Sequence, residues 1–315
     1  MGAVDTVCFA QMFRLSFEHH RLPLLRTFRV FPFRPLALLS NHISPAKNLS
    51  YWHRPHTSKS CMPVLFLHGI GIGLQTYTDF FQDLIRSTDR NVHDGQVGIL
   101  AIEMMPVSFR ICDAAPPMKE MVKQLRSILK KHAWDKFVLV AHSYGTLVAT
   151  HLLRDPEIGL NIDSVVLVDP VTLSIHQGDI PYNFLYRAPQ SPSEYQLHHF
   201  ACTDISVAHT LTRRVDWTDN ILWKDELKGK RVTVLLSGKD IIVDTERLGK
   251  YLSKDHDIKE AGSTDIEDWK TRSWNDEGLN IMWCKGLNHA EVFNFASERA
   301  PLVYIIDKYS RQHQS

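Results

Sequence analysis

The feature that most constrains the fold is residues 137–153, FVLVAHSYGTLVATHLL, in which an unbroken apolar run leads through a short turn into a second apolar stretch. Apolar runs rich in β-branched residues, without polar alternation, are typical of strands buried on both faces of a parallel sheet. Residues 164–168, SVVLV, form a second such run. From residue 62 onward, short apolar runs alternate with amphipathic segments, which indicates βαβ units. The sequence therefore predicts an α/β fold with a mainly parallel sheet flanked by helices.

Residue patterns place the individual elements. Strands are expected at residues 62–67, 98–102, 137–141, 164–168, 231–236 and 280–283. Helices are expected at residues 77–86, 117–131 and 145–153. Pro117 favours the second of these helices, because proline is tolerated in a first helical turn. Regular periodicity is lost after Pro170 and returns at residue 231, which predicts an insertion.

The length of 315 residues lies near the upper limit for one hydrophobic core, so one domain with an insertion is expected. Residues 51–170 and 229–315 form the predicted core, and residues 171–228 form a lid. Residues 1–50 form a basic, apolar N-terminal extension. The net charge of +1 disfavours a nucleic-acid binder, which needs a basic stripe. No apolar run is long enough to predict a membrane-spanning helix.

The N-terminal region differs in charge from the rest of the chain. Residues 1–60 carry eight Lys and Arg against two acids, whereas the remainder is net negative. Residues 11–40 have two interpretations: an arm packed against the core, which we favour, or a peripheral contact with an anionic membrane surface. The start, MGAVDT, also matches the loose pattern for myristoylation at Gly2.

Cysteine usage bears on the compartment. The five cysteines are odd in number and widely spaced, which suits a reducing environment better than a disulfide framework. We therefore expect an intracellular, cytoplasmic protein. Peroxisomal import or membrane association are alternatives, but the chain ends in RQHQS, which is no S-K-L-type signal.

Ser143 is the candidate nucleophile. It lies between a predicted strand and a predicted helix, in the turn Ala141-His142-Ser143-Tyr144-Gly145. A serine hydroxyl becomes reactive when a tight turn holds it beside a base, and such turns need small residues two positions before and after it. Ala141 and Gly145 meet that requirement. An ordinary turn serine is the alternative for this motif taken alone.

A glycine-rich loop follows the first core strand, in LFLHGIGIG at residues 65–73. Its backbone can turn an N–H group toward the cavity above the sheet. We predict that the N–H groups of Ile70 and Tyr144 form an oxyanion hole. A dinucleotide site is the alternative, but the loop lacks the G-x-G-x-x-G spacing.

A base and an orienting acid complete the predicted site. Asp240, in SGKD, follows a buried strand, and His289, in GLNH, follows the last strand. A histidine must take the serine proton, and a carboxylate must fix its tautomer. Asp169, directly after residues 164–168, is the more serious competing acid. Asp244 competes less well, because its position resembles a helix N-cap.

With HGIGIG, AHSYG, SGKD and GLNH in this order, residues 50–315 resemble the α/β-hydrolase superfamily. The resemblance implies the α/β-hydrolase fold with an inserted lid and a Ser143, Asp240, His289 triad. Ala141 departs from the commonest elbow, which has glycine. The segment YWHRPHTSK at residues 51–59 and the Trp-rich lid also resemble fungal α/β-hydrolases, a group that includes hydrolases of secondary-metabolite and toxin gene clusters.

The predicted lid is rich in aromatic residues: Tyr182, Phe184, Tyr186, Tyr195, Phe200, Trp217 and Trp223. Such rings suit an apolar acyl or polyketide-like substrate, or they pack the lid onto the core. The spacing of His198, His199, Cys202 and His209 fits no tetrahedral zinc pattern, so neither metal nor cofactor is predicted. The sequence thus predicts a serine hydrolase of carboxylic esters or thioesters. An acyltransferase with the same triad and a non-catalytic ligand-binding protein are the alternatives.

Overall fold

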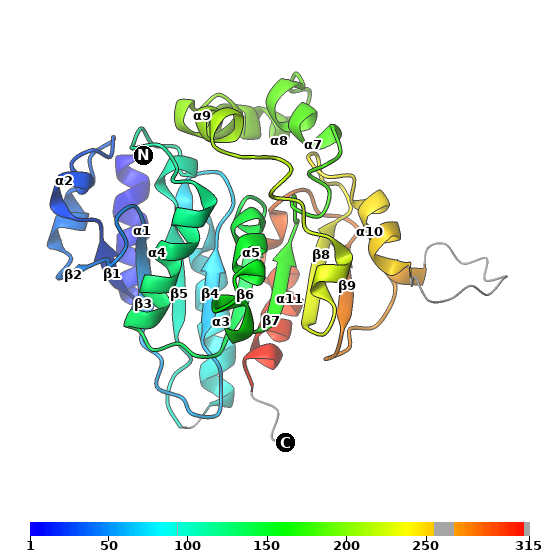
Figure 1. The fold of residues 1–315 in the computed structure, drawn as a ribbon, viewed down its shortest axis with the longest axis horizontal. Helices are drawn as coiled ribbons and strands as arrows, with labels where there is room; N and C mark the ends of the chain where they lie inside the picture. Colours follow the sequence, from blue (N-terminus) through cyan, green and yellow to red (C-terminus); the bar gives the residue numbers. More distant parts are fainter. Residues whose placement is uncertain (93, 255–267, 312–315) are drawn as a thin grey trace.

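A nine-stranded sheet organises the molecule, in the order β2-β1-β3-β5-β4-β6-β7-β8-β9 (Figure 1). The computed structural model describes residues 1–92, 94–254 and 268–311. Within the sheet, β3 runs antiparallel to β1 and β5, and the other neighbouring pairs are parallel. The strands are β1 (Glu18–Arg21), β2 (His42–Ile43), β3 (Ser50–Arg54), β4 (Val64–Leu67), β5 (Ile99–Glu103), β6 (Phe137–His142), β7 (Ile162–Val168), β8 (Arg231–Ser237) and β9 (Leu279–Cys284).

Helices cover both faces of the sheet. They are α1 (Gly2–Arg14), α2 (Leu24–Thr27), α3 (Thr78–Asn91), α4 (Met118–Lys131), α5 (Gly145–Arg154), α6 (Ile158–Asn161), α7 (Asp179–Pro181), α8 (Pro192–Leu197), α9 (Ile205–Arg213), α10 (Thr245–Ser253) and α11 (Ala296–Ser310). The core strands and the helices at residues 77–86, 117–131 and 145–153 are confirmed to within a few residues, apart from the longer α3. The α/β class and the mainly parallel sheet are therefore confirmed.

Alternating side chains of each central strand feed two separate halves of the core. In β4, Leu65 and Leu67 face the half that contains α4, α5 and α10. Val64 and Phe66 face the half that contains α1, α3 and α11. Because successive side chains of a strand point to opposite faces, a strand buried on both sides must be apolar throughout. This requirement explains the unbroken runs in the sequence.

Residues 1–50 add elements that the sequence patterns do not predict. β1 and β2 extend the sheet beyond β3, and α1 packs on the face that also carries α3 (Figure 1). A buried ionic group holds this region: Arg34 contacts Asp5 at 3.1 Å and Glu103 at 2.8 Å. Arg110 also contacts Asp5. The N-terminal segment is therefore tied to the sheet through charges as well as apolar contacts.

The segment between β7 and β8 crosses the carboxyl edge of the sheet, with α7, α8 and α9 at the top of Figure 1. Its rings do not share one environment. Phe184 is buried and Trp217 packs on the core. The rings of Tyr182, Tyr186, Tyr195 and Trp223 are 46–73% exposed. The side chain of Phe200 and the chain end at residues 312–315 lie outside the described part of the protein.

Across the described ranges, none of the helices combines the length and apolar character needed to cross a bilayer.

Candidate active site

Ser143 occupies a strained turn between β6 and α5. Its φ angle is +49°, in the left-handed region that a residue with a side chain seldom adopts. Gly145 permits this turn, because a Cβ at that position would lie 2.4 Å from the carbonyl oxygen of Leu67. The Ser143 N–H donates to the carbonyl of Val168 at 3.0 Å, which ties the turn to β7. The sequence places the hydroxyl at the carboxyl edge of the sheet, where strands end and loops converge.

His289 lies in the loop after β9 and reaches Ser143. Its Nε2 lies 2.9 Å from Ser143 Oγ, and its Nδ1 lies 2.7 Å from Asp240 Oδ2. This spacing lets Nδ1–H donate to the carboxylate while Nε2 accepts the hydroxyl proton. The structure thus brings together the three residues that the sequence predicts as a triad.

Both carboxylate oxygens of Asp240 have hydrogen-bond partners. Its Oδ1 accepts the N–H groups of Ile242 at 2.7 Å and Val243 at 3.0 Å, while Oδ2 faces His289. The side chain is fully buried. A carboxylate with its lone pairs occupied in this way has one orientation, so it fixes the position of the imidazole.

The two competing acids have other positions. Asp244 caps α10, its side chain accepting the N–H of Arg247 at 3.0 Å. Asp169 lies at the end of β7 with a φ of +43°, and it accepts the N–H groups of Ser237 at 3.0 Å and Ala290 at 2.9 Å. Asp169 therefore supports the loops that carry Asp240 and His289, and its carboxylate lies within the same group of side chains.

The charges at this site act on one another. Burial, reinforced by the nearby charge of Asp240, raises the pKa of Asp169 to about 6. Burial alone would lower the pKa of His289, but the charge and hydrogen bond of Asp240 and the charge of Asp169 raise it above its usual value. An imidazolium at position 289 is thus stabilised by two carboxylates, as the proton-accepting step of acyl transfer requires.

The glycine-rich loop that carries Ile70 lies against the turn that carries Ser143 and Tyr144. A Cβ on Gly69 would lie 2.9 Å from Ser143 Cβ, so the glycine-rich loop packs directly on the serine. The backbone N–H groups of Ile70 and Tyr144 donate to no acceptor among the residues that the structure describes. Neither amide is therefore committed to an acceptor within the described protein.

Sequence reasoning missed a hydrogen-bonded pair beneath the turn. The hydroxyl of Tyr77 lies 2.8 Å from His142 Nδ1 and accepts the N–H of Gly69 at 3.0 Å. Both side chains are buried, and burial holds the pKa of His142 well below its usual value. The position of His142 beside Ser143 is visible in the sequence, whereas nothing in the sequence marks Tyr77 as its partner.

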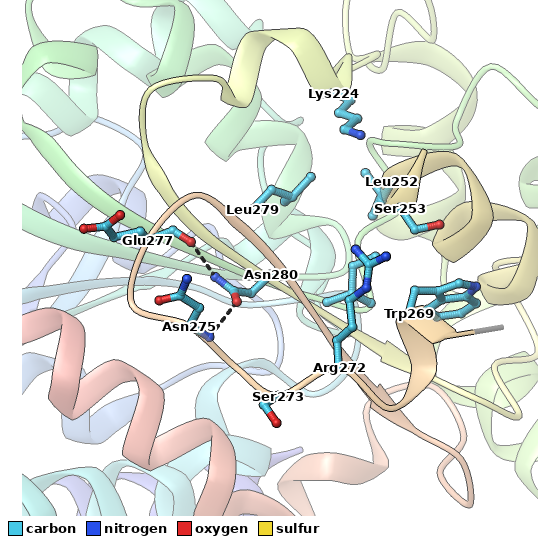
Figure 2. A pocket seen from close by; sticks show the side chains of 11 residues that line it. Lys224, Leu252, Ser253, Trp269, Arg272, Ser273, Asn275, Glu277, Leu279 and Asn280 are labelled. Atoms are coloured by element: carbon cyan, nitrogen blue, oxygen red, sulfur yellow. Dashed lines mark hydrogen bonds between the residues drawn. The ribbon is translucent and has the colours of Figure 1, made fainter. Parts of the chain in front are cut away.

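A separate pocket of about 310 Å³ lies beside β9 and α10 (Figure 2). Its lining is mainly polar: Lys224, Leu252, Ser253, Trp269, Arg272, Ser273, Asn275, Glu277, Leu279, Asn280 and Ile281. Asn280 is fixed there by bonds to the backbone of Asn275 and Glu277. None of the triad residues lines this pocket.

Comparison with known families gives a match over most of the chain. Residues 63–304 match the family model described as alpha/beta hydrolase fold. A search of curated proteins found no match.

Solved structures with the same fold are distant in sequence. The meta-cleavage product hydrolase from Pseudomonas fluorescens IP01 is 14% identical, with a TM-score of 0.53, and the match covers 83% of this chain and 94% of that one. A carboxylesterase structure from Nitrososphaera gargenis is 14% identical, with a TM-score of 0.50 and coverages of 83% and 95%. A bacterial membrane phospholipase A is 12% identical, with a TM-score of 0.50, and the match covers 98% of this chain and 91% of the phospholipase chain. At these identities the likeness establishes the fold.

Proposed function

The chain belongs to the alpha/beta hydrolase fold family, and we propose that it is a serine hydrolase that cleaves a carboxylic ester or thioester through an acyl-enzyme. The observation that carries the proposal is the continuous path Ser143 Oγ, His289 Nε2, His289 Nδ1 and Asp240 Oδ2, with separations of 2.9 Å and 2.7 Å. A serine hydroxyl, an imidazole and a carboxylate in this order are the components of nucleophilic acyl transfer.

The proposed reaction has two halves. Ser143 Oγ bonds to the acyl carbon while its proton passes to His289 Nε2. The oxygen of the tetrahedral intermediate then accepts the N–H groups of Ile70 and Tyr144. Collapse expels the alcohol or thiol, which takes the proton from His289. Water next attacks the acyl-enzyme with His289 as base, releasing the acid and restoring Ser143.

An apolar acyl substrate is the proposed class. Buried Phe184 and Ile180 of the lid join the core cluster that also contains Tyr144. An acyl chain entering between lid and turn would meet these apolar side chains. A polyketide-like acyl group in a fungal secondary-metabolite pathway would fit this class, and that assignment rests on the sequence resemblance alone.

The testing experiment is steady-state hydrolysis of p-nitrophenyl esters of increasing acyl length by wild type and Ser143→Ala. We expect turnover that rises from acetate toward longer chains, and a loss of about 10⁴-fold or more in kcat/KM for Ser143→Ala. Asp244→Asn is the matched control, because asparagine also caps a helix. Equal turnover by wild type and Ser143→Ala would reject the proposal.

The same assay separates the two alternatives. An acyltransferase would convert the ester faster when an alcohol or amine acceptor is added, and would form the acylated acceptor in place of the acid. A non-catalytic binding protein would bind long-chain acids without any Ser143-dependent turnover. Product analysis by mass spectrometry with and without acceptor distinguishes these outcomes.

A further inference from the structure

Histidine side chains gather at the N-terminal edge of the sheet, far in sequence from the triad. In the β1–β3 ladder His20 lies opposite Tyr51 and Glu18 lies opposite His53, and in the β1–β2 ladder His20 lies opposite His42. Residues two apart in a strand share a face, so the register places these five side chains on one face. Strand pairing therefore assembles a cluster that no local sequence spacing predicts.

α4 covers the same face and adds a further imidazole. His132 caps the C-terminal end of this helix, and its Nε2 lies 2.9 Å from the hydroxyl of Tyr51. Its ring lies 3.8 Å from that of His53, measured between centroids. One ring nitrogen from each of His20, His53 and His132 falls within 4.8 Å of the others. Three imidazoles thus converge from β1, β3 and α4.

The ring nitrogens in this cluster have free coordination capacity. His20 is 2% exposed and His53 is 8% exposed, and His20 Nε2 and His53 Nδ1 have no hydrogen-bond partner in the described structure. Buried polar atoms normally have partners, because leaving one without a partner costs roughly 1–3 kcal/mol. Two such atoms in one cluster point to a ligand between them.

A carboxylate lies beside the same nitrogens. Glu18 Oε2 lies 3.9 Å from His20 Nε2 and 3.6 Å from His53 Nδ1. These separations are too long for hydrogen bonds. They are slightly longer than the separation of about 3.3–3.5 Å between neighbouring ligand atoms of a tetrahedral zinc ion, as its bonds of about 2.0–2.2 Å imply.

We propose that His20, His53 and His132, with Glu18 as the fourth ligand, bind one divalent transition-metal cation of the zinc type. Imidazole nitrogens and a carboxylate suit such ions: the three imidazoles form the core of the site, and Glu18, whose side chain is 44% exposed, is the ligand on its solvent side. The ion would join β1, β3 and α4 and so fasten the N-terminal segment to the core. This metal site would take no part in the proposed ester hydrolysis.

The surroundings of the cluster suit this role. The hydroxyl of Tyr51 lies 3.0 Å from His20 Nδ1 and 2.9 Å from His132 Nε2, so it can orient both rings from outside the ligand group. Burial and the nearby charge of Lys131 lower the pKa of His20. Lys131 contacts the Nδ1 side of that ring and also donates to the carbonyl of Ile43.

The test is zinc titration of the full chain, purified without a histidine tag and stripped with a chelator, by calorimetry and by thermal unfolding. We expect one zinc ion per chain and an unfolding temperature that rises with zinc. Glu18→Gln and His132→Gln should each weaken binding by at least about tenfold. Glu18 is partly exposed, so its variant keeps the fold even if His132→Gln does not.

Two matched variants complete the experiment. His176→Gln removes an exposed histidine elsewhere, and His289→Gln disrupts the second group of potential ligands, Asp169, Asp240 and His289. Both should bind zinc as wild type does. The proposal is overturned if wild type shows no micromolar binding, if Glu18→Gln binds unchanged, or if only His289→Gln loses binding.

Discussion

Asp169 illustrates how one side chain serves both structure and electrostatics. Its two oxygens accept the N–H groups of Ser237, at the end of β8, and of Ala290, the residue after His289. Its charge also contributes to the raised pKa of His289. The sequence offers Asp169 as an alternative catalytic acid. In the structure Asp240 contacts His289, and Asp169 instead supports the neighbouring loops and stabilises the protonated imidazole.

Asp169→Asn should move the acidic limb of the kcat/KM profile to lower pH. His289 must be neutral to accept a proton, so activity falls as pH drops through its pKa, which is raised above the usual value for histidine. In that range Asp169, with a pKa of about 6, is mostly ionised and stabilises the imidazolium. Removing its charge lowers the pKa of His289. The measurement is a pH profile of ester hydrolysis, with Asp244→Asn as control, and an unshifted limb would contradict this account.

At the scale of elements, α1 and the segment that follows it are fastened to the sheet through Arg34. Its guanidinium is 5% exposed and bridges Asp5 of α1 to Glu103 at the end of β5. Glu103 also accepts from Ser50 of β3 at 2.7 Å. The guanidinium of Arg34 therefore connects α1 to β5 and, through Glu103, to β3, although these elements are far apart in the sequence.

Arg34→Met should destabilise the fold strongly. Removing one partner of a buried ionic group leaves uncompensated charge and costs about 3–5 kcal/mol. Arg86→Met is the control, because Arg86 is 61% exposed and its contact to Asp83 is 3.9 Å long, so its loss should cost less than about 1 kcal/mol. Urea unfolding monitored by circular dichroism measures both, and equal midpoints for the two variants would refute the role of Arg34.

The difference between predictable and unpredictable elements has a physical basis. Strands such as β6 and β7 are buried on both faces, so burial alone dictates an apolar run that the sequence displays. β1, with the residues EHHR, is polar because its side chains enter ionic and histidine contacts with distant residues. The Ser143 turn is local and visible in the sequence. The Tyr77–His142 contact and the histidine cluster are created by long-range pairing, which single-sequence patterns do not encode.

For the whole molecule, exposed apolar side chains concentrate at the N-terminal edge. Seven apolar side chains between residues 24 and 43 are 39–82% exposed: Leu24, Leu25, Phe28, Phe31, Phe33, Leu39 and Ile43. Ile111, which pairs with Phe31 in a β-bridge, is also exposed. The structure also shows that some of the basic charge in this region is engaged, since Arg34 is buried and Arg26 pairs with Asp113. Exposed apolar area therefore offers a stronger basis for membrane contact than net charge does.

A membrane contact through this edge predicts that the chain cosediments with anionic liposomes and that Leu25→Ser/Phe28→Ser weakens this binding several-fold. The reason is the loss of apolar area, worth about 25 cal/mol per Å². Leu160→Ser is the matched control, because Leu160 is 75% exposed on α6, outside the N-terminal segment. Equal pelleting of the two variants, or no pelleting of wild type, would exclude a membrane contact through this edge.

The central claim is that Ser143 is the nucleophile of a serine hydrolase, and covalent labelling tests it most directly. A fluorophosphonate probe should add once to the wild-type chain, and peptide mass spectrometry should place the adduct on Ser143. His289→Gln should label at least about 10³-fold more slowly, because the hydroxyl loses its base. Labelling at another residue, or equal labelling of wild type and Ser143→Ala, would contradict the account.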